Sequence, residues 1–202
     1  ATVRSYFRSV AHRVRDFRRI FLPKIGILYQ HNPIPLRVAK HYAEFHAPDP
    51  GRASRISIVT PTHNQAALIE RTAKSVLDQA YPNLEYIVQD EGSTDETLEV
   101  MRPYLGRLAH FESCAERGQA RAFNLGTKNT NGEIMACLNS GDVLLPGSLN
   151  YVADYFTRHP AVDAIYGHRL IINGNDEQIG HWILPRHDND ILLWADFVPQ
   201  ET

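Results

Sequence analysis

Three short polar stretches each follow an apolar segment, and two of them place an acid at or near the point where that segment ends. They are Thr62-His63-Asn64, Asp90-Glu91-Gly92-Ser93 and Asn139-Ser140-Gly141-Asp142. A carboxylate at the end of a buried strand costs free energy unless a cation or hydrogen-bond donors meet it. Carboxylate oxygens are also the ligands that hard divalent cations prefer. Asp90 and Asp142 therefore indicate a site for a ligand that carries hydroxyl groups and a divalent cation, such as a metal-bound nucleotide.

The elements that must position these stretches alternate between strand and helix from residue 55 onward. Apolar and β-branched runs predict strands, and apolar residues at spacings of three and four predict helices. The expected strands are 55–60, ending before Pro61, then 84–90, 110–114, 133–140 and one that opens within 162–173. The expected helices lie within 65–83, 91–105, 118–130 and 146–160, the second of them capped by Ser93 or Thr94. This order predicts an α/β fold, a Rossmann-like and mainly parallel sheet with helices on both faces.

In an open parallel sheet, ligands bind at the carboxyl ends of the strands. The three polar stretches are therefore expected along one edge, where the two acids share one cleft. The first strand is followed by neither G-x-G-x-x-G nor G-x-x-x-x-G-K-[ST], which disfavours a dinucleotide or P-loop site. The absence of a Gly-rich phosphate loop also disfavours a nucleotidyltransferase.

The N-terminal region differs in charge from the rest. Residues 1–55 hold 11 Lys and Arg against 3 Asp and Glu, whereas the whole chain has a net charge of −2. We expect 1–54 to form a basic amphipathic helix followed by a Pro-rich linker, in which 30–54 are either irregular or a strap over the domain, and 55–202 to form the main domain. The helix places an apolar stripe beside arginines, so it either packs on a protein surface or contacts an anionic membrane through residues 1–24.

The composition limits the cellular compartments and the classes of binding partner that we expect. The chain has two cysteines, which do not suggest a disulfide framework. No apolar run has the roughly 18 to 20 residues needed to span a bilayer. We therefore expect a cytoplasmic protein, peripheral at most to the inner face of the membrane. The basic charge is confined to one segment, so we expect no nucleic-acid partner.

A resemblance becomes specific at the polar stretches. The segments SIVTPTHNQAALIERTAKSVLDQAYPNLEYIVQDEGSTDETLEV and ERGQARAFNLGTKNTNGEIMACLNSGDVLLPGSL are similar to the nucleotide-binding core of family 2 glycosyltransferases with the GT-A fold, over residues 55 to about 170. The resemblance implies transfer of a sugar, with inversion, from a nucleoside-diphosphate sugar to a saccharide or lipid-linked acceptor in cell-surface polysaccharide synthesis. It implies a donor of the UDP type and Mg²⁺ or Mn²⁺ as cofactor, which neutralises the departing diphosphate.

The same resemblance assigns roles to individual residues. Asp142 would bind the metal ion, and Asp90 would accept hydrogen bonds from the base or ribose. The wall around the base would be formed by Pro61, Thr62 and Asn64. The residues that would contact the base or the sugar donor are Arg117, Gly118, Gln119 and Asn124, together with the position of Gly141.

Three positions depart from the family's usual pattern. Gly141 replaces the first acid of the tip, Glu91 stands where Gly is frequent, and Arg121 stands where a small polar residue is usual. Arg121 either meets a phosphate or sugar carboxylate or is a solvated surface residue. The loss of an acid at Gly141 leaves open a second function, a degenerate, non-catalytic module that binds or scaffolds.

Family members usually continue into an acceptor-binding half that supplies the catalytic base. We expect 55–202 to be truncated at that end, and no catalytic residue is identified. The remaining acids that could act as the base are Asp188, Asp190 and Asp196.

Overall fold

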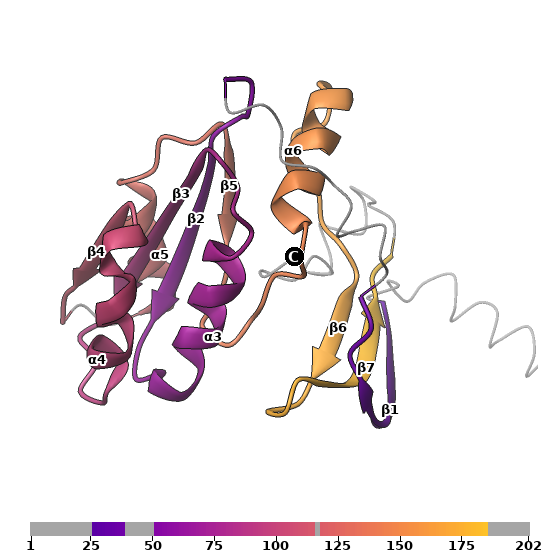
Figure 1. Ribbon diagram of the computed structural model, residues 1–202, viewed down its shortest axis with the longest axis horizontal. Coiled ribbons are helices and arrows are strands. Elements are labelled where there is room, and N and C mark those ends of the chain that lie inside the picture. The colour runs from indigo at the N-terminus through magenta and orange to yellow at the C-terminus, as the bar shows by residue number, and fades with distance from the viewer. Residues whose placement is uncertain (1–25, 39–50, 116–117, 186–202) are drawn as a thin grey trace, which may run out of the picture. The chain divides into compact units, whose positions relative to one another are not determined.

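The computed structural model describes residues 26–38, 51–115 and 118–185, which belong to two compact units (Figure 1). The parallel-sheet unit comprises the described residues between 37 and 164, and the antiparallel-sheet unit comprises 26–36 and 165–185. The expected N-terminal helix, Arg117 and the candidate bases Asp188, Asp190 and Asp196 lie outside the described residues. Within the described ranges, no helix is both long enough and apolar enough to cross a membrane.

The parallel-sheet unit contains four strands in the order β4-β3-β2-β5, and all neighbours are parallel (Figure 1). The strands are β2 (Ile56–Thr62), β3 (Leu84–Asp90), β4 (His110–Ser113) and β5 (Ile134–Cys137). Their register aligns the carboxyl ends, with Thr62 beside Asp90 and Asp90 beside Ser113. The predicted parallel α/β fold is confirmed.

The helices of this unit are α3 (Ala66–Leu77), α4 (Thr97–Met101), the 3₁₀ helix η1 (Arg102–Arg107), α5 (Gln119–Thr127) and α6 (Ser148–Arg158). On one face of the sheet, Ile58 and Val88 belong to a core with α3 and α6. On the other face α5 packs on β2 and β3 so closely that a Cβ at Gly126 would lie 2.4 Å from Val59 Cγ1. Helices therefore cover both faces, as predicted.

Strand β2 continues through Pro61, although the proline was expected to end it. Proline lacks an N–H group, so it fits a strand where no neighbour needs that donor. The carbonyl of Val59 accepts a bond from Leu138 N at 3.0 Å, and the ladder between β2 and β5 ends at Cys137. Pro61 is still paired with Gln89 of β3, but on the β5 side the ladder has already ended, and there its carbonyl accepts a bond from Ser140 Oγ at 3.0 Å.

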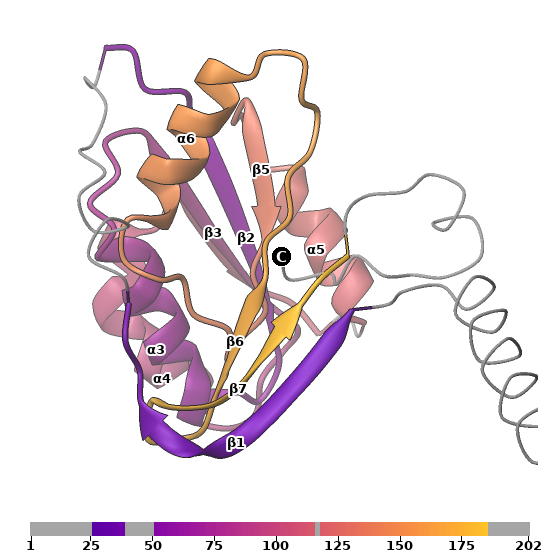
Figure 2. The ribbon, with the colours of Figure 1, turned by 90° about the vertical axis from the view of Figure 1, so that its right-hand side faces the viewer.

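The antiparallel-sheet unit contains β1 (Ile27–Pro35), β7 (Glu177–Ile183) and β6 (Arg169–Ile172) in the order β1-β7-β6 (Figure 2). Residues 30–35 were expected in an irregular linker or a strap over the domain; the irregular linker is wrong here, because these residues belong to β1 and Gln30, Ile34 and Pro35 pair with β7. Strand β1 is exposed throughout and carries two prolines, so its sequence shows no buried-strand pattern. The ladder becomes irregular between Gln30 and Ile34, around Pro33. The division of the chain at residue 54 stays a prediction.

Candidate functional site

The three polar stretches meet at one edge of the parallel sheet, as expected. The backbone N–H of Glu91 donates to the carbonyl of Thr62 at 2.9 Å, which joins the ends of β2 and β3. The hydroxyl of Ser140 donates to the carbonyl of Pro61, which joins the loop after β5 to the end of β2. Acids from two strand ends and a threonine from a third are therefore parts of one connected structure.

Asp90 lies at the centre of this edge and is fully buried. Its Oδ2 accepts bonds from Ser93 N at 2.9 Å and Ser113 Oγ at 2.6 Å, and its Oδ1 accepts one from Ser93 Oγ at 2.5 Å. These donors meet the cost of burying the carboxylate. A carboxylate offers about four acceptor positions, so these three bonds leave one of them unused. Sequence reasoning missed Ser113, whose role depends on the register between β3 and β4.

Asn64 ties the loop after β2 to the loop after β3. Its backbone has φ of 51°, in the left-handed region that Asn tolerates better than most residues. Its Oδ1 accepts bonds from the backbone N–H of Thr94 at 2.8 Å and of Asp95 at 3.3 Å. Its own N–H donates to Ser93 Oγ at 2.8 Å. Asn64 therefore organises the wall of the candidate site, and its contact with a base stays a prediction.

The expected helix cap at Ser93 or Thr94 is wrong, because α4 begins at Thr97. Asp95 serves the turn instead, accepting bonds from Thr97 N at 3.0 Å and from Ala66 N, at the start of α3, at 3.1 Å. The Thr97 hydroxyl is the main cause that holds the pKa of Asp95 below its ordinary value; desolvation opposes it, and the backbone donors add to the lowering. One exposed carboxylate thus links the starts of two helices.

The start of α5 is fixed by two side-chain contacts. Glu91, one of the departures from the family pattern, accepts a bond from Gly118 N at 2.6 Å. Gln119 Nε2 donates to Asn139 Oδ1 at 2.6 Å, which brings α5 to the loop after β5. Asn124 is exposed and lies across the helix from Ala122 and Gly126, which face the sheet. The structure thus brings Gly118 and Gln119 to the edge but not Asn124.

Arg121 is also exposed on α5. At 100° per residue it lies roughly opposite Gln119, the residue that reaches Asn139. Its role toward a phosphate stays a prediction.

The loop that carries Asp142 has a backbone that favours glycine at the position of the missing acid. Gly141 has φ of 105°, a conformation that L side chains rarely adopt. Its N–H donates to Thr72 Oγ1 at 2.9 Å. Asp142 itself is half-buried, and its N–H donates to the carbonyl of Asn139 at 3.1 Å. The departure at Gly141 is therefore built into the loop conformation.

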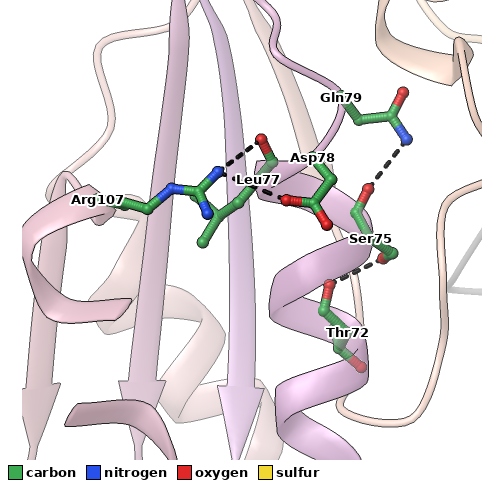
Figure 3. A network of polar contacts seen from close by, with 6 residues as sticks. All are labelled: Thr72, Ser75, Leu77, Asp78, Gln79 and Arg107. Atoms are coloured by element: carbon green, nitrogen blue, oxygen red, sulfur yellow. Dashed lines mark hydrogen bonds and ion pairs between the residues drawn. The ribbon is translucent and has the colours of Figure 1, made fainter. Parts of the chain in front are cut away.

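Sequence reasoning also missed three polar residues of α3 and the segment just after it, Thr72, Ser75 and Gln79 (Figure 3). The N–H of Leu144 donates to Ser75 Oγ at 3.0 Å, and Gln79 Nε2 donates to the carbonyl of Leu145 at 3.0 Å. The signal in the sequence was the spacing of these three residues, i, i+3 and i+7, which places three polar side chains on one side of a helix.

A divalent cation fits the donors present at this edge. In the described part of the chain, no three His, Cys, Asp or Glu side chains form a group that could hold a metal. Mg²⁺ is commonly held by only one or two carboxylates together with the phosphates of its substrate. The half-buried carboxylate of Asp142, on a loop held by backbone hydrogen bonds, is a donor of this kind.

A helix-covered parallel sheet with acids at its carboxyl edge defines the class of open α/β domains, which bind their ligands at that edge. Comparison with known sequences identifies the family within that class. The model of the family described as Glycosyl transferase family 2 matches residues 57–196. The chain belongs to this family.

Known relatives agree with the assignment. An uncharacterized glycosyltransferase of Nostoc sp. is 32% identical over 130 residues, covering 62% of this chain and 39% of the relative. A poly-beta-1,6-N-acetyl-D-glucosamine synthase of Staphylococcus epidermidis is 28% identical over 120 residues, 58% of this chain and 29% of the relative. The crystal structure of S. aureus TarS 1-349 in complex with UDP-GlcNAc matches with a TM-score of 0.50 and 25% identity, over 52% of this chain and 32% of that one. The chain spans less than half the length of these proteins.

Proposed function

We propose that this chain binds a nucleoside-diphosphate sugar of the UDP type, together with Mg²⁺ or Mn²⁺, at the edge where β2, β3 and the loop after β5 meet. It would be the donor-binding part of a glycosyltransferase that passes the sugar, with inversion, to a saccharide or lipid-linked acceptor in cell-surface polysaccharide synthesis. The observation that carries this proposal is the hydrogen-bonded assembly of the three polar stretches, with Asp90 and Asp142 among them.

Each residue has a defined task in this proposal. Asp142 would hold the divalent ion, which stabilises the charge that develops on the departing diphosphate when it is bound. Asp90 would orient the base or ribose while Ser93 and Ser113 keep its carboxylate in place. Thr62 is 2% exposed, and its hydroxyl has no hydrogen-bond partner among the residues that the structure describes, so a polar group of the donor could satisfy it. The catalytic base remains unassigned.

The relatives support the choice of donor and pathway class. One of the matching structures is a complex of S. aureus TarS 1-349 with UDP, and another is its complex with UDP-GlcNAc. A further relative is described as a putative teichuronic acid biosynthesis glycosyltransferase of Bacillus subtilis, 29% identical over 119 residues. These names motivate a UDP-type donor and a polysaccharide product for this chain.

The test is a thermal-shift panel of UDP, GDP, dTDP and CDP, each with and without Mn²⁺, on the full chain and on Asp142→Ala. A ligand that binds only the folded state stabilises it by RT ln(1 + [L]/Kd), so sub-millimolar binding is visible at a few millimolar ligand. We expect a shift with UDP that requires both Mn²⁺ and Asp142. A panel with no shift from any nucleotide would refute donor binding.

A second candidate function is a degenerate module that keeps the fold but does not transfer sugar. The observation that favours it is Gly141, whose φ of 105° excludes a relaxed Asp at the place of the family's first acid. Weak or absent nucleotide binding by a well-folded chain would support this alternative. Metal-dependent UDP binding would count against it.

Residues 1–24 provide a separate proposal about location. Their basic, amphipathic sequence would attach the chain to an anionic membrane surface and place the site near a lipid-linked acceptor. Flotation with anionic liposomes should be lost when residues 1–24 are deleted. Equal flotation of the shortened chain would contradict this role.

A further inference from the structure

Three polar side chains along α3 and its end contact the loop that carries Asp142. Thr72 Oγ1 accepts a bond from Gly141 N at 2.9 Å, and Ser75 Oγ accepts one from Leu144 N at 3.0 Å. Gln79 Nε2 donates to the carbonyl of Leu145 at 3.0 Å. Asp142 therefore lies between two backbone amides, those of Gly141 and Leu144, that are both held by side chains from a different element.

Two of these side chains, those of Ser75 and Gln79, are also tied to their own helix or its end (Figure 3). Ser75 Oγ donates to the carbonyl of Thr72 at 2.8 Å, and Gln79 Nε2 donates to the carbonyl of Ser75 at 2.9 Å. At the end of α3, Arg107 donates to the carbonyl of Leu77 at 3.0 Å. The hydrogen-bonding groups of Ser75 and Gln79 are thus oriented by α3 as well as by the loop.

The position of these residues on α3 is unusual for a helix that packs on a core. Ile69, Ala73 and Val76 supply the apolar contacts of α3. Thr72 is just as fully buried, and burying a hydroxyl group costs free energy unless a hydrogen bond compensates. At this position the compensation comes from a backbone amide of the Asp142 loop, so the loop and α3 constrain each other.

We propose that Thr72, Ser75 and Gln79 are positioning residues of the metal site. They hold residues 141–145 in the conformation in which Asp142 presents its carboxylate to the divalent cation. This inference rests on the proposed function, because it assigns a role toward the metal that Asp142 binds there. Carboxylates and loops fixed in advance bind metal more tightly, because less conformational freedom is lost on binding.

Thr72→Val tests the proposal, because valine keeps the shape of the side chain and removes the hydroxyl. Thr72→Ser keeps the hydroxyl and should restore function. Thr157→Val is the matched control, since the Thr157 hydroxyl donates to the carbonyl of Ala153 within α6, at 2.8 Å. Two quantities are measured on the full chain: hydrogen exchange of residues 138–147 without ligand, and the Mn²⁺ concentration that gives half of the UDP-dependent thermal shift.

We expect Thr72→Val to accelerate exchange of 138–147 and to raise the required Mn²⁺ concentration by about 10- to 100-fold, the usual effect of losing a group that orients a metal ligand. Thr72→Ser and Thr157→Val should behave like the unmodified chain in both measurements. The proposal is overturned if Thr72→Val lowers only the unfolding temperature, or leaves exchange of 138–147 unchanged. If the unmodified chain shows no Mn²⁺-dependent UDP binding, the proposed function fails and the inference fails with it, while the exchange data still report whether Thr72 holds the loop.

Discussion

Restoring the family's missing acid by Gly141→Asp should destabilise the protein rather than repair the site. The backbone at Gly141 has φ of 105°, so any L residue there is strained. Such strain costs about 1–3 kcal/mol. A new Cβ would also lie 3.3 Å from Leu68 Cδ1, but the Leu68 side chain is 38% exposed and can move aside. The backbone therefore dominates, and we expect a loss of about 1–3 kcal/mol.

Urea unfolding followed by far-ultraviolet circular dichroism measures this loss. With a slope of about 2 kcal/mol per molar urea, the midpoint should fall by about 0.5–1.5 M. Gly106→Asp is the matched control, because a Cβ at Gly106 meets nothing within 4 Å and its backbone is not in the left-handed region. Gly141→Ala should lose about as much as Gly141→Asp, which separates strain from charge. Equal midpoints for Gly141→Asp and Gly106→Asp would refute the reasoning, and tighter Mn²⁺ binding by Gly141→Asp would show that the loop tolerates the second acid.

Three further predictions concern the surroundings of the site. Asn64→Ala should lower the free energy of unfolding by about 1–3 kcal/mol, because two backbone N–H groups lose their acceptor. Asn64→Asp keeps an acceptor, so its free energy of unfolding should fall clearly less in the same urea titration. Gly126→Ala should lower the free energy of unfolding by about 1–3 kcal/mol through overpacking against Val59. In a double-mutant cycle, Val59→Ala should recover part of this loss. If the effects of the two substitutions are strictly additive, the contact is not the cause. Burial raises the pKa of Glu85, but hydrogen bonds, first from the Ser57 hydroxyl, outweigh this and leave it below the ordinary value of 4.5. The stability that ionised Glu85 contributes is therefore present above pH 4.5 and lost as the pH falls through its folded pKa. The free energy of unfolding of the unmodified chain should therefore approach that of Glu85→Gln on acidification. A difference that stays constant with pH would contradict the assignment.

Much of the fold could be predicted from local sequence patterns. The run from Leu84 to Asp90 was expected as a strand and forms β3 with the same limits. Pro61 was expected to end β2, and it does not. The strand on its β5 side ends first, so no ladder bond needs the N–H group that proline lacks. Strand β1 could not be predicted, because it is exposed along its length and its partner β7 lies far along the chain.

The sequence by itself determined that acids and polar residues end several parallel strands, and parallel topology then brings those ends to one edge. It did not determine what each polar group binds. The bond between Gly141 and Thr72 joins residues 69 positions apart, and the bond between Gly118 and Glu91 joins residues 27 apart. Sequence periodicity indicates on which side of its own helix or strand a residue lies. Its hydrogen-bond partners in other elements depend on how those elements pack. Only the tertiary structure therefore showed that α3 holds the loop of Asp142.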